Sequence, residues 1–67
     1  MPLLLDLIRA GELPNDVPLH IEVFHASSSE RFGTTLKELE NDTALLSYHV
    51  IAIFPKETLW IIHLKKG

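Results

Sequence analysis

Four histidines, His20, His25, His49 and His63, are the side chains best suited to bind a metal ion, since imidazole is the commonest metal ligand in proteins. Their spacing argues against a shared site. His20 and His25 lie five residues apart on an expected strand and so point to opposite faces, and His49 and His63 fall on opposite faces of an expected hairpin. The chain has no cysteine to complete a ligand set. We therefore expect no metal and no cofactor, and four partly exposed histidines at strand edges or ends.

Other residue types that could act in catalysis are also poorly arranged. The serines at 27–29 have none of the glycines of a nucleophile elbow, and three isolated glycines form no phosphate-binding loop. Glu38 and Glu40 are two residues apart on an expected helix and point apart, while Glu38 completes a capping box with Thr35. We expect no catalytic residue and no enzyme. A small metal-dependent enzyme is the remaining enzymatic alternative, and zinc or manganese would then raise its melting temperature.

The length and composition predict one small globular domain spanning residues 1–67, with 46% apolar and 22% charged residues. A domain of this size has a small core and usually needs a further source of stability. Disulfides are excluded because the chain has no cysteine, which leaves a metal or oligomerisation. The lack of cysteine suits the cytoplasm, and no apolar run approaches membrane-spanning length, so we expect no membrane association.

The net charge of −3 is concentrated in residues 12–42, where seven acids face only Arg31 and Lys37. Direct binding of nucleic acid is disfavoured because it requires a basic stripe, and only Lys65 and Lys66 are clustered. The acids either form an ordinary solvated surface or attract a basic partner. They are Glu12, Asp16, Glu22, Glu30, Glu38, Glu40 and Asp42.

The strongest structural signal is a hairpin, with strands over 48–54 and 59–64 and a turn at 55–58, because both segments are rich in β-branched and aromatic residues. If Phe54 pairs with Leu59, each face of the hairpin is largely apolar. A half-exposed strand alternates apolar and polar residues, so this hairpin must be covered on both faces. One face comprises Val50, Ala52, Phe54, Leu59, Ile61 and His63, and the other comprises His49, Ile51, Ile53, Trp60, Ile62 and Leu64.

The preceding elements are expected to be a helix over 2–10 that ends at Gly11, a strand over 19–25, a weak return strand over 31–34 and a short helix over 36–41. The expected fold is α+β, in which the N-terminal helix packs on a three- to four-stranded, mainly antiparallel sheet and a short second helix precedes the C-terminal hairpin. The first strand is expected to pair with the last.

The N-terminal helix is expected to cover the Ala52 side of the hairpin, because alanine allows close approach. That assignment leaves a candidate interface comprising Ile51, Ile53, Trp60 and Ile62. Tryptophan is enriched at binding hot spots, and monomers rarely expose a contiguous apolar patch of this kind. The patch is covered by the helix over 36–41 or the segment over 42–47, by another copy of the chain or by a different protein.

The segments Asp6-Leu7-Ile8, Gly11 to Asp16, Leu45 to Val50 and Phe54 to Glu57, in this order around an alternating strand, resemble small uncharacterised proteins of phages and prophages of Gram-positive bacteria. The resemblance spans nearly the whole chain through turn and packing positions, but the serine-rich loop and the four histidines are not part of it. It implies a phage accessory context in the host cytoplasm and carries over no catalytic residue to this chain.

We thus expect a non-enzymatic homo-oligomer that acts through contacts with host or phage proteins. The alternative is an acidic inhibitor that imitates phosphates towards a host nucleic-acid-binding enzyme. Salt would weaken binding by such an inhibitor and would leave an apolar contact unchanged or stronger.

Overall fold

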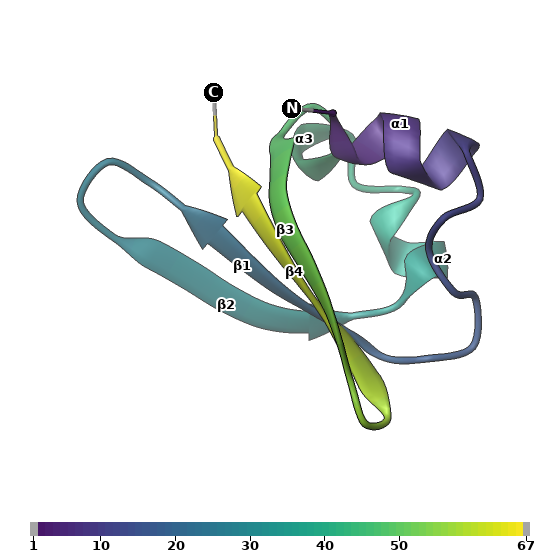
Figure 1. The fold of residues 1–67 in the computed structure, drawn as a ribbon. Coiled ribbons are helices and arrows are strands. Elements are labelled where there is room, and N and C mark those ends of the chain that lie inside the picture. The colour runs from purple at the N-terminus through teal and green to yellow at the C-terminus, as the bar shows by residue number, and fades with distance from the viewer. Residues whose placement is uncertain (1, 67) are drawn as a thin grey trace.

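The computed structural model of the chain describes residues 2–66, which form short helices packed beside one sheet (Figure 1). In chain order the elements are α1 (Leu4–Arg9), β1 (Leu19–Phe24), β2 (Ser29–Thr34), α2 (Leu36–Leu39), α3 (Thr43–Leu46), β3 (His49–Lys56) and β4 (Leu59–Lys65). This is the expected α+β architecture, with an N-terminal helix and a C-terminal hairpin.

The four strands form a mixed sheet in the order β2-β1-β4-β3. β1 pairs antiparallel with β2, and β3 pairs antiparallel with β4. The central pair, β1 and β4, is parallel, and it confirms the prediction that the first strand pairs with the last. The three helices lie on one side of this sheet in Figure 1, so the sheet has a covered face and an open face.

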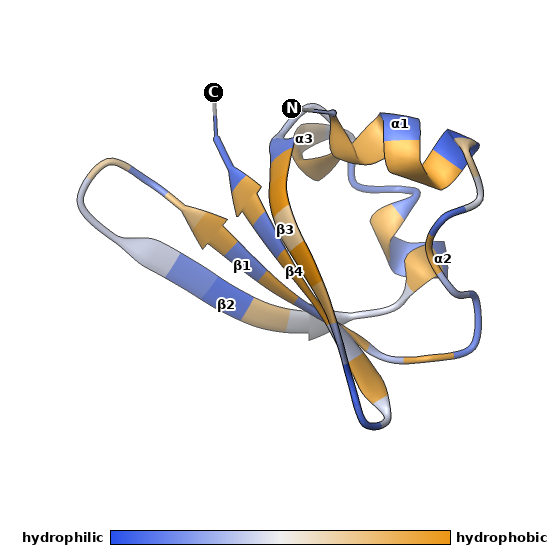
Figure 2. Cartoon of the chain, in the orientation of Figure 1, coloured by the Kyte–Doolittle hydropathy of each residue, from blue (hydrophilic) through white to orange (hydrophobic). Residues whose placement is uncertain are grey.

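The covered face contains the core, and the alternation of β1 explains its position. Leu19, Ile21 and Val23 are all buried, whereas the residues between them are only half-buried. The parallel register places Ile21 beside Ile62 and Val23 beside Leu64 of β4, and both of these residues are fully buried. Figure 2 shows the corresponding alternation of hydrophobic and hydrophilic residues along β1. The helices complete the core with Leu4, Leu36, Leu39 and Leu45.

Local signals define the ends of the helices. The Asp6 carboxylate accepts a hydrogen bond from the Leu3 N–H (3.1 Å), and Gly11, which follows the C-cap residue Ala10 of α1, adopts a φ of +71°. The Thr35 hydroxyl accepts from the Glu38 N–H (3.3 Å) at the start of α2, at the position of the predicted capping box. The second helix is shorter than the expected 36–41, because Asp42 begins a further helix, α3, by accepting from the Leu45 N–H (3.2 Å).

The C-terminal hairpin has a different register from the predicted one. Its strands run to Lys56 and from Leu59, so the turn contains only Glu57 and Thr58, and Phe54 pairs with Ile61 instead of Leu59. A bulge interrupts β3 between Val50 and Ala52.

The bulge changes the face to which the first residues of β3 belong. Val50 lies opposite Leu64 and is buried, although unbroken alternation placed it on the other face. His49 lies opposite Lys65, which places it on the same face as His63, so the expectation that these two histidines point apart is wrong.

Candidate functional site

The helices cover the face of the hairpin that includes Trp60, which is the first of the three alternatives that the sequence left open for this face. Ile62 is fully buried, and Ile53 and Trp60 pack against the core. Ile51 lies in the bulge and is 44% exposed. The expectation that the N-terminal helix packs on the Ala52 side is therefore wrong. The physical reason is the register with β1, which makes Trp60 and Ile62 continuous with the buried side chains of Leu19 and Ile21.

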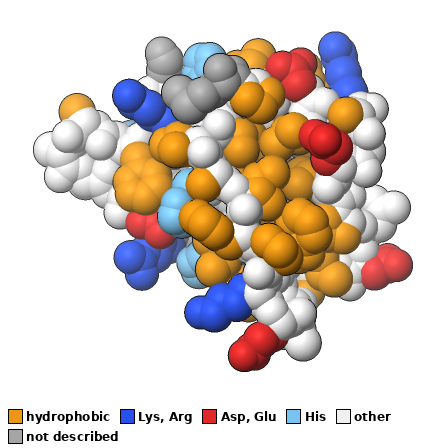
Figure 3. Space-filling view, in the orientation of Figure 1, with side chains coloured by type: hydrophobic (Ala, Val, Ile, Leu, Met, Phe, Trp, Pro, Cys, Tyr) orange, Lys and Arg blue, Asp and Glu red, His pale blue; other side chains and the backbone are white. Residues whose placement is uncertain are grey.

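The opposite face of the sheet, here called the open face, is the candidate functional site. Its apolar part comprises Phe24 of β1, Leu59 and Ile61 of β4, and Ala52 and Phe54 of β3. Phe54 is 47% exposed, and it is one of two large hydrophobic residues that are exposed in the described part of the chain. In the orientation of Figure 1, hydrophobic side chains gather in the middle of the molecule, over β3 and the helices (Figure 3), so exposed apolar atoms are not confined to the open face.

His63 occupies the middle of the open face between two aromatic rings. Its ring centroid is 5.2 Å from that of Phe24 and 5.1 Å from that of Phe54, and both pairs are edge-to-face. The three rings come from neighbouring strands, β1, β4 and β3. They form an aromatic row across the sheet rather than a cavity, so the arrangement suits contact with a flat surface.

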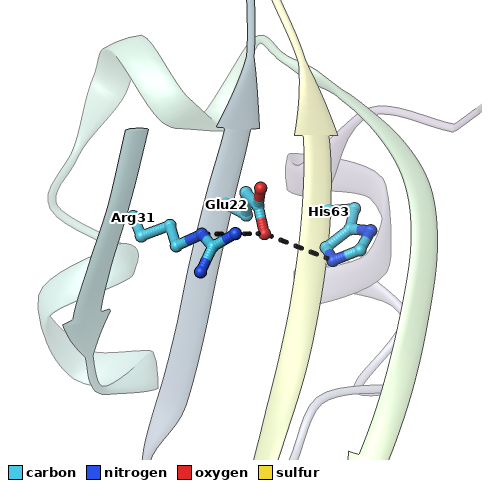
Figure 4. A network of polar contacts seen from close by, with 3 residues as sticks. All are labelled: Glu22, Arg31 and His63. Carbon is cyan, nitrogen blue, oxygen red and sulfur yellow. Dashed lines mark ion pairs between the residues drawn. The ribbon is translucent and has the colours of Figure 1, made fainter. Parts of the chain in front are cut away.

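A second row crosses the same face through Glu22 (Figure 4). Its carboxylate oxygen lies 3.4 Å from Nε of Arg31 on β2 and 3.7 Å from Nε2 of His63 on β4. The Glu22 side chain is only 13% exposed, whereas that of Arg31 is 68% exposed. The carboxylate is thus half-buried and compensated by a cation, which balances charge on the open face.

The remaining candidate residues for chemistry do not converge. His25 Nε2 lies 3.8 Å from a Glu30 carboxylate oxygen at the far end of the β1–β2 hairpin, and it has no hydrogen-bond partner. Ser27 and Ser28 lie between β1 and β2, and Ser29 begins β2. Within residues 2–66, no group of three or more histidines and carboxylates could hold a metal ion.

The seven acids of the predicted acidic surface are largely engaged in local contacts. Glu22 and Glu30 lie within 4 Å of basic side chains, the Glu38 carboxylate accepts from the Thr34 hydroxyl (3.2 Å), and Asp42 caps α3. Glu12, Asp16 and Glu40 are exposed, the first two between α1 and β1 and the last at the end of α2. The acids are therefore divided among different elements.

An apolar hollow of about 290 Å³ lies between α1 and α3. Its lining comprises Leu3, Leu5, Thr43, Leu46 and Ser47. The Ser47 hydroxyl donates to the Ala44 carbonyl oxygen (2.8 Å), and none of the five side chains titrates near neutral pH. This hollow lacks the convergent polar groups of a catalytic site.

None of the helices described over residues 2–66 is long and apolar enough to cross a membrane. No family model, curated protein or solved structure matches the chain. The open face is therefore the main physical basis for inferring what the chain does.

Proposed function

We propose that this chain is a non-enzymatic interaction protein that associates with a second copy of itself through the open face. The observation that supports the proposal is the one-sided placement of the helices against a sheet that has apolar residues on both faces. An antiparallel sheet that has one face in water usually has polar residues on that face. Here Phe54, Ile61 and Phe24 lie among the polar residues of that face.

The size of the open face predicts a weak contact. The sheet has four strands. At a strand spacing of about 4.8 Å and a length of about 20 Å, such a sheet presents roughly 400 Å². Stable interfaces bury about 800 Å² on each partner. One open face against another should therefore give a dimer whose population depends strongly on protein concentration.

The charges of the open face are compatible with self-association. Glu22 is compensated by Arg31 within the chain, so contact between two copies does not bury an unpaired carboxylate. Lys56 and Lys65, the two lysines of β3 and β4, are the last residues of those strands and are exposed. Cations at the ends of strands can stay in water while the aromatic row is buried.

The wider setting is part of the same proposal. The resemblance to small phage and prophage proteins supports an accessory role in the host cytoplasm, and a phage or host protein could then bind the surfaces that remain free in the oligomer. An acidic inhibitor is less well supported, because four of its seven acids are engaged in caps and pairs.

A dilution series followed by nuclear magnetic resonance tests the proposed contact. Chemical shifts of Phe24, Ala52, Phe54 and Ile61 should change with protein concentration, while those of Thr43 and Ser47 beside α1 should not. The changes should persist when salt is raised, because an apolar contact is not screened. Changes confined to the helices, or lost in salt, would contradict the proposal.

A further inference from the structure

The two edges of the sheet are protected very differently. On the β3 edge, the segment before α1 bonds to the outer side of the strand: the Val50 N–H donates to the Pro2 carbonyl oxygen (2.9 Å), and the Leu4 N–H donates to that of Tyr48 (3.0 Å). The bulge at Ile51 and Pro55, which has no N–H, interrupt the rest of this edge. Such features prevent a further strand from pairing with an edge.

The β2 edge has none of these protections. β2 pairs with β1 over six residues without a register shift, it contains no proline, and no strand within residues 2–66 lies beyond it. Its residues are small or polar apart from Phe32, as Figure 2 also shows. Six residues of unbroken strand with unpaired backbone groups form a surface that another strand can extend.

The hydrogen bonds at the ends of β1 show which β2 groups are unpaired. The Trp60 N–H donates to the Pro18 carbonyl oxygen, and the Lys66 N–H donates to the Phe24 carbonyl oxygen. Because the backbone groups of successive residues in a strand point to alternate sides, the even-numbered residues of β1 form hydrogen bonds with β4 and the odd-numbered residues form them with β2. Residues 19, 21 and 23 pair with 34, 32 and 30 of β2. The N–H and C=O groups of Ser29, Arg31 and Gly33 therefore point outwards.

We propose that the β2 strand of a second copy pairs antiparallel with this edge, with Phe32 opposite Phe32 of the second copy. Directly opposite residues of an antiparallel pair point to the same face of the sheet, whereas neighbouring residues of one strand point to opposite faces. A two-fold axis perpendicular to the sheet must therefore pass beside one β2 residue, which then pairs with the same residue of the second copy. An axis at Glu30 or Arg31 would place like charges directly opposite each other, which is unfavourable. An axis at Phe32 places Arg31 opposite Gly33 and Glu30 opposite Thr34.

The side chains fit this register. Phe32 and its copy would form a non-hydrogen-bonded pair, in which side chains approach most closely. An Arg31–Gly33 pair would lie on each side of it, and in each pair both outward N–H groups would donate to the carbonyl oxygen of the opposite residue. Phe32 is half-buried and packs against the core, so its ring is already held in place. An added Cβ at Gly33 would meet no atom within 4 Å, so the space beside it is open for the Arg31 side chain.

The edge contact does not depend on the open-face contact, but edge pairing would strengthen the open-face contact. Two edge-paired copies form one eight-stranded sheet whose open faces adjoin, which doubles the area to roughly 800 Å² and reaches the size of a stable interface. The two contacts have perpendicular two-fold axes, and together they would close a tetramer.

The test compares Gly33→Pro with Gly33→Ala in a chain that also has Phe54→Lys, which removes the open-face contact. Proline at position 33 removes an outward N–H and leaves the β1–β2 bonds intact, whereas alanine keeps the N–H. Light scattering should give a dimeric mass for Gly33→Ala and a monomeric mass for Gly33→Pro. Equal masses for the two variants would overturn the edge contact while leaving the open-face proposal standing.

Amide hydrogen exchange on the unmodified chain provides a readout that does not depend on how a variant folds. The amides of Arg31 and Gly33 have no acceptor within the described chain, so they should be protected at high protein concentration and lose at least tenfold of that protection on dilution. Rapid exchange of both amides at every concentration would overturn the proposal.

Discussion

Glu22 and His63 lie side by side on the parallel strands β1 and β4, with a carboxylate oxygen 3.7 Å from Nε2, in the middle of the open face. Arg31 approaches the same carboxylate from the other side at 3.4 Å. The row places one compensated carboxylate beside the aromatic row of Phe24, His63 and Phe54, so pairing between the strands sets the positions of these polar side chains.

Because Arg31 is 68% exposed, this row should add little to stability. Glu22→Gln keeps the size of the side chain and removes its charge, and it should lower the free energy of unfolding by no more than about 1 kcal/mol. Urea denaturation checks this, with Arg31→Gln as the control from the other end of the contact. A loss several times larger in either variant would show that the row holds the fold together.

Truncation of two adjacent isoleucines of β4 should affect different properties, the stability of the fold for one and self-association for the other. Ile62 is fully buried, so Ile62→Ala should cost about 2–5 kcal/mol and leave so small a domain largely unfolded. Ile61 lies on the open face, so Ile61→Ala should leave a folded monomer with weaker self-association. Thermal unfolding in dilute solution distinguishes them, and equal losses would contradict the assignment of faces.

The hairpin turn contains a correctable strain. Glu57 adopts a φ of +50°, a conformation that costs a residue with a side chain about 1–2 kcal/mol and suits glycine at the first position of a two-residue turn. Glu57→Gly should therefore raise the free energy of unfolding by about 1 kcal/mol after the entropy cost of glycine. Thr58→Gly, at a position without positive φ, should lower it. Stabilisation by both changes, or by neither, would argue against the observed turn.

The cap of α3 gives a test of the role of one acid. Asp42→Ala removes the acceptor of the Leu45 N–H and should cost about 1 kcal/mol, whereas Asp42→Asn keeps an acceptor oxygen and should cost little. Chemical denaturation of both variants checks this. If the asparagine variant were as unstable as the alanine variant, the charge rather than the cap would be the contribution of Asp42.

The features that the sequence predicted correctly are set by neighbouring residues. Gly11 ends α1, Thr35 caps α2, and the alternation of Leu19, Ile21 and Val23 marks the buried side of β1. Each of these signals lies within a few residues of the structure that it defines, so no knowledge of the rest of the fold is needed.

The assignment of faces depends on pairing between distant segments, and here the sequence was misleading. Unbroken alternation gave no sign of the bulge between Val50 and Ala52, and the parallel register of β1 and β4 pairs residues that are 41 positions apart. One signal was present. His63 and Lys65 alternate with Ile62 and Leu64, so the side of β4 that includes His63 is the more polar one and is the side that the helices leave uncovered.

The central claim is that the open face binds a second copy, and the solution mass of Phe54→Lys tests it most directly. The lysine would place a charge in the aromatic row beside His63, while Thr58→Lys adds the same charge at the exposed hairpin turn as a control. Light scattering over a range of concentrations should show the Thr58→Lys variant reaching the mass of the unmodified chain and the Phe54→Lys variant reaching half of it. Equal masses for all three folded proteins would contradict the claim.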